Sequence, residues 1–202
     1  MQPSSSAHLP SFVHLRCHSE YSVVDGMLRV DDYVTRAAQD DMPALALSDL
    51  ANLFATVKFY QAARGKGIKP LIACDIWLEN ETSRDQPYRA LLLCQSHAGY
   101  LRLCELLTKA YLHNQYRGRA EIKKDWFVEN GSEGLILLSG AMLGDVGQTL
   151  LQDNRRSARQ LAQSWSSLFP KRYYLELQRA GHAQQEMYIA RALALASELN
   201  LP

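Results

Sequence analysis

The segment 12–26 carries the side chains of this chain that are best suited to chemistry. Its first part alternates like a β-strand, which places His14 and His18 on one face because strand side chains point alternately to opposite sides. Asp25 follows in the loop behind them. Two imidazoles and a carboxylate could begin a metal site. Arg16 lies between the two histidines and argues against it, because a guanidinium keeps its proton and cannot ligate a cation.

Two further carboxylates follow predicted strands. Asp49 closes one apolar run and Asp75 closes the next. In α/β barrels the chemistry lies at the C-terminal ends of the strands, so these two would converge with the histidines and Asp25 on one mouth. Such a set suits hydrolytic metal chemistry, in which a bound cation lowers the pKa of water. The alternative is that they cap the next helix, a role that suits Asp49 because Asn52 follows it.

The elements that would hold these side chains alternate between strand and helix. Apolar runs predict strands at 12–17, 44–47, 71–76, 90–94, 135–138 and 173–177. Periodic apolar positions predict helices at 30–39, 53–64, 100–112, 156–169 and 184–199. The alternation indicates an α/β fold with a parallel sheet, either open or closed into a barrel. The polar segments 79–86 and 116–124 are predicted to be a surface loop and a linker.

At 202 residues and 47% apolar residues, the chain can form one domain, or one domain and part of another. Residues 1–11 lack the features of a signal peptide and are interpreted as a flexible leader before a domain at 12–202. The sequence stops just after a helix, and we expect the final strand of the domain to lie beyond Pro202. No apolar run reaches the roughly 18–20 residues of a membrane span.

Charge and cysteine content narrow the possible functions. A net charge of +1 excludes a nucleic-acid binder that acts by bulk positive charge. The segment 102–124 has a local basic excess with two tyrosines interleaved, so it could contact DNA phosphates or could be a solvated face. Its candidate phosphate contacts are Lys109, Arg117, Arg119, Lys123 and Lys124. The four cysteines have no C-x-x-C spacing and indicate reduced residues of a cytoplasmic protein.

Other motifs favour structural roles. Gly65-Lys-Gly67 follows a predicted helix, whereas a phosphate-binding glycine loop precedes one. Ser22 and Ser139 lack the surrounding sequence of a serine nucleophile. Trp126 and Phe127 are interpreted as a small core anchor; exposed, they would indicate a partner site.

Several long motifs occur in the order found in a known family. They are His-Leu-Arg-Cys-His-Ser-Glu-Tyr-Ser-Val-Val-Asp-Gly from position 14, Met-Pro-Ala-Leu-Ala-Leu-Ser-Asp-Leu-Ala-Asn-Leu-Phe from 42, and Gly-Ile-Lys-Pro-Leu-Ile-Ala-Cys-Asp from 67. The chain resembles the polymerase-and-histidinol-phosphatase (PHP) domain family, and within it the N-terminal domains of bacterial DNA polymerase III alpha subunits. The resemblance implies a distorted (β/α)7 barrel, C-terminally incomplete here.

The resemblance also implies a metal pattern that this chain keeps only in part. His14, His18, Asp25 and Asp49 match the pattern, and Asp75 stands where metal-binding members carry a glutamate. Four other ligand positions hold residues that cannot bind a cation: Arg16, Leu50, Arg89 and Ala180. We therefore expect a vestigial pocket without metal, in which arginines pair with the remaining aspartates and take the cation's place.

Two functions follow from the resemblance. The first is a non-catalytic scaffold that docks the proofreading exonuclease (epsilon) subunit. The full-length protein would then be a DNA-directed DNA polymerase, a nucleotidyltransferase of the bacterial cytoplasm with Mg²⁺ in a later domain. It would meet DNA and the other holoenzyme subunits, and no membrane. The second function is enzymatic: a metal-dependent phosphoesterase or a built-in 3′–5′ proofreading exonuclease.

Overall fold

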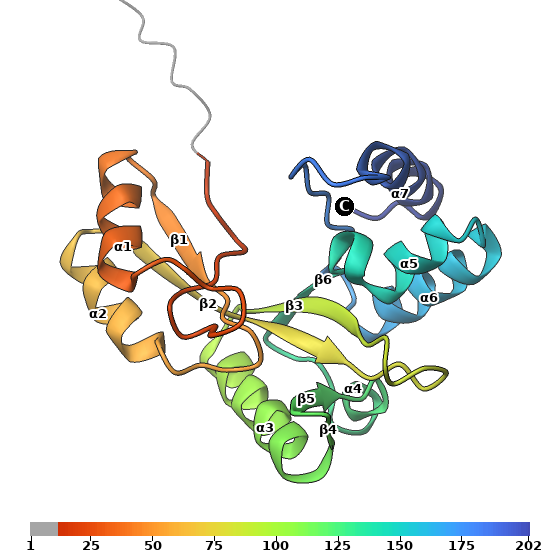
Figure 1. Ribbon diagram of the computed structural model, residues 1–202, viewed down its shortest axis with the longest axis horizontal. Helices are drawn as coiled ribbons and strands as arrows, with labels where there is room; N and C mark the ends of the chain where they lie inside the picture. The colour runs from red at the N-terminus through yellow and green to blue at the C-terminus, as the bar shows by residue number, and fades with distance from the viewer. Residues whose placement is uncertain (1–11) are drawn as a thin grey trace, which may run out of the picture. The chain divides into compact units, whose positions relative to one another are not determined.

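The computed structural model describes residues 12–202, and the predicted leader at 1–11 lies outside the described residues (Figure 1). The chain forms two compact units. The first unit contains residues 12–49 and Leu53–Ile72, and the second contains Leu50–Asn52 and Ala73–Pro202. The assignment of 12–202 to a single domain stays a prediction.

Two helices and two strands build the first unit (Figure 1). They are α1 (Val30–Gln39), β1 (Ala44–Leu47), α2 (Thr56–Gly65) and the first part of β2 (Lys69–Leu78). β1 and β2 pair in parallel, which requires a crossover, and α2 provides it. Apolar residues at helical spacing form one face on each of α1 and α2, and these faces pack with β1 into the core of the unit. The predicted bounds of α1 and β1 are confirmed.

The strand predicted at 12–17 is wrong, because this segment contains no strand. It runs beside β1 and accepts hydrogen bonds at two points, Ala46 N–H to the His14 carbonyl and Ser48 N–H to the Cys17 carbonyl, both 2.9 Å. The two acceptors, His14 and Cys17, are three residues apart, whereas the two donors, Ala46 and Ser48, are two residues apart. A regular ladder of hydrogen bonds between the two segments therefore cannot form. The Ser48 hydroxyl also accepts from the Cys17 N–H at 2.9 Å and replaces a backbone partner.

The second unit is built around the remainder of the sheet, whose order is β4-β5-β2-β3-β6-β7. Its strands besides β2 are β3 (Tyr88–Cys94), β4 (Gln115–Tyr116), β5 (Arg119–Ile122), β6 (Leu135–Leu138) and β7 (Tyr173–Tyr174). β3 is antiparallel to β2 and β6, whereas β5 runs parallel to β2 and β7 parallel to β6. This path does not close into a barrel over the described residues.

The prediction of a parallel sheet is therefore wrong for β3, which is antiparallel to both of its neighbours. The loop 79–87 joins β2 directly to β3, and a connection without a crossover helix produces an antiparallel pair. The predicted surface loop at 79–86 is confirmed. The predicted linker at 116–124 instead contains the turn and second strand of the β4–β5 hairpin, whose Arg-Gly turn places Arg117 and Gly118 at positive φ.

Helices supply the rest of the second unit (Figure 1). They are α3 (His97–His113), α4 (Asp125–Asn130), the 3₁₀ turn η1 (Ala141–Leu143), α5 (Asp145–Leu151), α6 (Arg155–Leu168) and α7 (Gln185–Leu199). Phe127 and Trp126 are buried, and the Phe127 ring lies 5.9 Å from Trp165 and 5.2 Å from Phe169. The predicted core anchor is confirmed. Over residues 12–202, no helix combines the length and apolar character needed to cross a membrane.

Candidate functional site

Asp49 is a buried carboxylate at the end of β1, and it holds the loop 19–28 in place. Its Oδ1 accepts the Ser19 N–H at 2.6 Å and the Ser22 hydroxyl at 3.0 Å, and its Oδ2 accepts the Ser19 hydroxyl at 2.8 Å. A bond from the Glu20 N–H to the Leu28 carbonyl at 2.8 Å closes the loop. The carboxylate thus pins the loop through protein donors, a role that sequence reasoning missed. The short hydroxyl side chains directly after His18 were the available signal.

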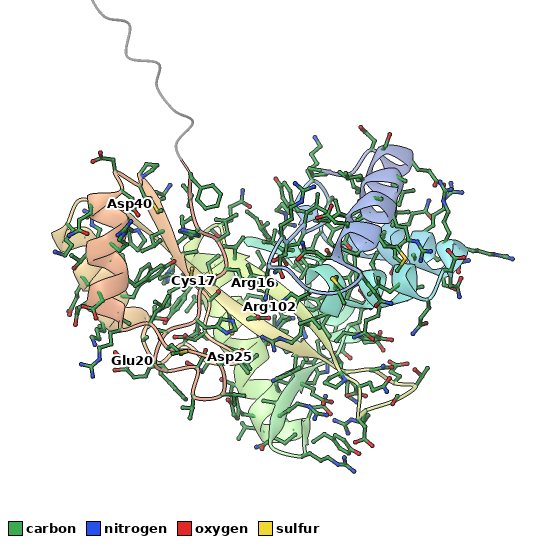
Figure 2. The ribbon with its side chains drawn as sticks, turned by 45° about the horizontal axis from the view of Figure 1, so that its top comes forward. Arg16, Cys17, Glu20, Asp25, Asp40 and Arg102 are labelled. Atoms are coloured by element: carbon green, nitrogen blue, oxygen red, sulfur yellow. The ribbon has the colours of Figure 1, made fainter. Side chains whose placement is uncertain are left out.

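His18, just before this loop, forms a pair with Asp25 inside it. Asp25 is labelled in Figure 2. His18 Nδ1 lies 2.8 Å from Asp25 Oδ1, and the imidazole is largely buried while the carboxylate is more exposed. A carboxylate on one ring nitrogen fixes the tautomer and the orientation of an imidazole, leaving the other nitrogen for a further partner. The pairing of these two predicted pocket residues is therefore suited to orienting an imidazole.

His14 lies in a different environment from His18. It is exposed, packs edge-on against the Phe12 ring at 4.8 Å, and lines a groove of about 380 Å³ together with Cys17 and Tyr33. Burial raises the pKa of the Cys17 thiol, which disfavours its thiolate form. Arg16, which lies between His14 and Cys17 in the sequence, is half-buried (Figure 2). The broken strand alternation explains why His14 and Cys17 share one groove.

In the second unit, Asp75 is paired with Arg89. Asp75 on β2 is buried, and its two oxygens accept from Arg89 Nε at 3.1 Å and Nη2 at 2.5 Å. The guanidinium also lies 4.4 Å above the ring of Trp77, the β2 residue opposite Arg89. This is a bidentate, charge-assisted pair further held by a cation–π contact. The predicted pairing of an arginine with a pocket aspartate is confirmed for these two residues.

At the other two predicted ligand positions, Leu50 and Ala180, the local contacts involve backbone groups. Leu50 forms an isolated bridge with Asp75, next to the Ala51 N–H that donates to the Asp75 carbonyl at 2.7 Å. Ala180 is exposed, and its N–H donates to Gln185 Oε1 at 2.6 Å ahead of α7. Neither side chain offers a ligand atom.

The donor set does not fit a multi-metal cluster. Within residues 12–202, no three His, Cys, Asp or Glu side chains gather closely enough to hold a metal ion. The oxygens of Asp49 accept serine and backbone donors, and those of Asp75 accept a guanidinium. Hydrolytic two-metal sites need several carboxylates and imidazoles that point at the cations instead. The described carboxylates are thus engaged by protein donors, and a pocket without metal stays a prediction.

The residues predicted to contact DNA phosphates are engaged within the protein. Lys109 pairs with Glu129 at 3.0 Å, Arg117 with Asp85 at 2.7 Å, and Lys123 lies 3.8 Å from Glu79. Arg119 pairs with Glu121 at 3.0 Å, and Lys124 lies 4.3 Å above the Trp165 ring. Each of these positive side chains thus lies close to a carboxylate or an aromatic ring of the protein. Contact with DNA stays a prediction.

A buried ion network around Glu121 was not predicted. Glu121 on β5 is fully buried and accepts from both Arg84 and Arg119 at 3.0 Å. The Arg84 guanidinium lies 4.7 Å above the Tyr116 ring and also donates to Asn114 Oδ1 at 3.1 Å. Two guanidinium groups satisfy one buried carboxylate and fix the β4–β5 hairpin to the loop that carries Arg84.

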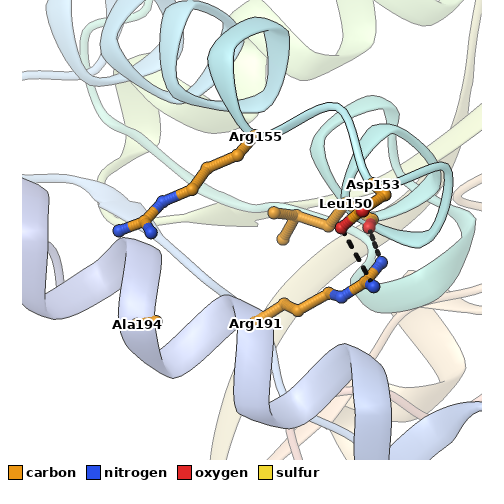
Figure 3. A pocket seen from close by; sticks show the side chains of 5 residues that line it. All are labelled: Leu150, Asp153, Arg155, Arg191 and Ala194. Atoms are coloured by element: carbon orange, nitrogen blue, oxygen red, sulfur yellow. Dashed lines mark hydrogen bonds and ion pairs between the residues drawn. The ribbon is translucent and has the colours of Figure 1, made fainter.

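A hollow of about 190 Å³ lies between α5, α6 and α7 (Figure 3). Arg191 on α7 crosses it to the Leu150 carbonyl at 2.5 Å and to Asp153 at 3.0 Å. Arg155 on α6 pairs with Glu198 at 2.7 Å. Both guanidinium groups are thus used to join the helices, so we assign the hollow a structural role.

The comparisons with known proteins identify the class. The family model for the PHP domain matches residues 14–180, so the chain belongs to the PHP domain family. Its fold is also similar to a solved structure from Bifidobacterium adolescentis described as a metal-dependent phosphoesterase. The TM-score is 0.55 at 12% identity, over 96% of this chain and 85% of that one. The predicted PHP-type fold class is confirmed.

Curated relatives narrow the class further. The chain is 43% identical over 195 residues to DNA polymerase III subunit alpha of Neisseria meningitidis serogroup A, covering 96% of this chain and 17% of that protein. The same subunit is 41% identical over 192 residues in Pseudomonas aeruginosa, with coverage of 95% and 16%, and 40% identical over 193 residues in Escherichia coli K12, with coverage of 96% and 17%. The chain thus spans 16–17% of the length of these relatives and is homologous to their N-terminal region.

Proposed function

We propose that this chain is a PHP domain whose metal pocket is degenerate, and that it serves a bacterial DNA polymerase III alpha subunit as a structural scaffold. In that role it docks the proofreading exonuclease subunit and has no catalytic residues of its own. DNA synthesis with Mg²⁺, contact with DNA and assembly with the remaining holoenzyme subunits would belong to the longer protein, in the bacterial cytoplasm.

The observation that carries this proposal is the pair of Asp75 and Arg89. Asp75 stands at a carboxylate position of the family's metal pattern, and Arg89 satisfies both of its oxygens. A guanidinium gives the carboxylate a permanent positive partner. Unlike a metal ion, it offers no coordination site on which water could be activated. Arg89 therefore neutralises the charge of Asp75, as a metal ion would, without being able to activate water.

Asp49, in the first unit, also supports the proposal of a degenerate metal pocket. A carboxylate that accepts three hydrogen bonds from Ser19 and Ser22 serves the loop that it holds. Releasing it to a metal ion would leave the Ser19 N–H and the buried hydroxyls without their acceptor, which is costly. The local structure therefore favours a structural carboxylate over a ligand.

The alternative is a metal-dependent phosphoesterase or an intrinsic 3′–5′ proofreading exonuclease. The pair of His18 and Asp25 favours it, because an imidazole oriented by a carboxylate is typical of metal sites. Under this alternative, His14, His18, Asp25 and Asp49 would gather around a cation on loading.

Two assays on the full-length polymerase subunit decide between these functions. Co-purification with the exonuclease subunit tests docking, and digestion of a primer with added Mn²⁺ tests chemistry. We expect docking, and no cleavage that depends on the pocket. Metal-stimulated cleavage that disappears in both His14→Ala and Asp49→Ala would replace the scaffold by the enzyme.

A further inference from the structure

The first unit exposes six large apolar side chains from two neighbouring segments. Val23, Val24 and Met27 in the loop 19–28 are 89–93% exposed. Phe54, Val57 and Tyr60, at and just before α2, are more than half exposed. We call these six residues the loop–α2 surface.

The two segments lie side by side. Lys58, within the α2 part of the surface, bonds to Glu20 in the loop at 3.0 Å and lies 3.5 Å from Asp31 in the first turn of α1. Figure 1 shows the loop next to the start of α2. The ion pairs of Lys58 therefore join the two segments, and the apolar side chains are exposed on neighbouring parts of the first unit.

Other side chains form the buried core of the first unit. The inward face of α2 consists of Phe59 and Ala63, both fully buried, with Ala55 just before the helix. Val57 and Tyr60, three residues apart, are neighbours on the exposed part of the helix surface. A helix with a second apolar stripe facing solvent is typical of one that binds another polypeptide.

The loop presents its apolar residues from a fixed backbone. Asp49 anchors both Ser19 and Ser22, as described above. Gly26 is so close to this turn that a Cβ there would lie within 1.7 Å of the Ser19 carbonyl oxygen. Such packing orders Val23 and Val24 before any partner arrives, and preordered contacts lose less entropy on binding.

Carboxylates border the surface and indicate the charge of its partner. The loop and the first turn of α1 contribute four of them, Glu20, Asp25, Asp31 and Asp32, all exposed. Two cations, Arg29 and Lys58, accompany them. The local excess of negative charge would attract lysine or arginine beside an apolar stripe and would repel an acidic segment.

We propose that the loop–α2 surface docks an amphipathic polypeptide segment that has an apolar stripe flanked by lysine or arginine. This inference rests on the proposed docking function and names the surface and the chemistry of the docked segment. The recognition mode is an amphipathic helix laid on an apolar face, with the carboxylates fixing its orientation.

Calorimetric titration of the full-length polymerase subunit with synthetic peptides tests the proposal. The probes are an amphipathic helix of leucine and lysine and its leucine–glutamate counterpart. We expect the lysine peptide to bind and the glutamate peptide to bind at least about tenfold more weakly. The double variant Val24→Ser/Val57→Ser should reduce lysine-peptide binding about tenfold or more, because it removes two apolar contacts. The matched control Leu112→Ser/Val128→Ser removes two similarly exposed apolar side chains of the second unit and should not change binding.

The same variants in co-purification with the exonuclease subunit separate this inference from the proposed function. Loss of docking in Val24→Ser/Val57→Ser, with folding intact by circular dichroism, supports the surface. Docking that survives this variant, together with unaffected peptide binding, overturns the surface and leaves the scaffold function standing. If the wild-type protein fails to dock the exonuclease, the proposed function fails, whereas variant-sensitive peptide binding still supports the surface. Self-association that the same variant abolishes would show that a second copy occupies the surface and would overturn the proposed partner.

Discussion

Arg89 shows how a single residue can decide what a pocket does. The guanidinium is 12% exposed and the Asp75 side chain 2%, so solvent screens their interaction little. The Trp77 ring covers the guanidinium and limits its movement. Removing one partner of such a pair leaves a buried charge without compensation, which costs more than the pair itself contributes.

We therefore predict that Arg89→Ala lowers the free energy of unfolding by about 3–5 kcal/mol, as expected when one partner of a buried pair is lost. Urea denaturation measures this change. Arg89→Lys should recover only part of the loss, because an ammonium group cannot bond both oxygens in the planar geometry of a guanidinium. In Asp75→Asn/Arg89→Ala the loss should be smaller than in Arg89→Ala alone. An unchanged denaturation midpoint for Arg89→Ala would show that the pair is not needed.

Asp145 is a second buried acid, and its protonation links stability to pH. Its oxygens accept from Trp165 Nε1 and the Val146 N–H, both at 2.7 Å. Burial nevertheless raises the pKa of Asp145 above its ordinary value of 3.8, since desolvation outweighs these bonds and the nearby charge of Lys124. A raised pKa in the folded state means that its contribution to stability is fully present below pH 3.8 and declines as pH rises through the folded pKa.

The expected result is that the stability advantage of the wild type over Asp145→Asn shrinks as pH rises from about 4 to 7. Urea denaturation across this range measures the difference. In Lys124→Met the decline should continue to higher pH and be larger in total, because the lysine charge that lowers the pKa of Asp145 is gone. An advantage that stays constant across the range would contradict the assigned burial effect.

At the scale of elements, Gly140 fixes how the end of β6 meets β3. Gly140 has φ +77°, and a Cβ there would lie 2.0 Å from the Arg89 carbonyl oxygen. The close approach of this turn to β3 holds the backbone that carries Arg89. Only glycine combines this conformation with this contact.

Gly140→Ala should lower the free energy of unfolding by about 2–4 kcal/mol, through positive-φ strain and the clash with the strand. Gly118→Ala is the matched control: its φ is +78°, and apart from Gly118 and its two neighbours in sequence no atom of the described residues lies within 4 Å of the added Cβ. Strain alone should then cost about 1–2 kcal/mol. Equal losses in the two variants, measured by thermal unfolding, would argue against the contact with Arg89.

Elements with a local apolar pattern were predictable from the sequence, and pairings between distant segments were not. The bounds of α1 are confirmed because apolar periodicity encodes them, and those of β1 and β6 because each is a continuous apolar run. The β4–β5 hairpin was missed because its strands are short and carry buried charges, which Arg84 compensates from far along the chain. In the candidate site the residue types were recognised, but the partners of Asp49 depend on a loop geometry that spacing cannot give.

At the scale of the whole molecule, the proposed loss of the metal site predicts indifference to divalent cations. A cation that binds only the folded state at about a hundredfold excess over its Kd would add about 2.7 kcal/mol of stability. In a chain of this size that corresponds to a rise of about 5–11 °C in Tm. We expect Zn²⁺ or Mn²⁺ to leave Tm unchanged, and a chelator to have no effect. A rise of this size that Asp49→Ala abolishes would restore the metal pocket.

The anchoring of the loop 19–28 by Asp49 also has a kinetic consequence. A surface that is already ordered meets its partner by rigid docking, for which association rate constants are typically about 10⁵–10⁷ M⁻¹ s⁻¹. Ser22→Ala would remove one anchor of the loop while leaving Val23 and Val24 in place. The loop would then spend part of its time in arrangements that cannot bind, and the observed association rate would fall with the fraction of molecules in the competent form. Asp49, a buried carboxylate outside the proposed docking surface, would in this way set the association rate of the docked segment.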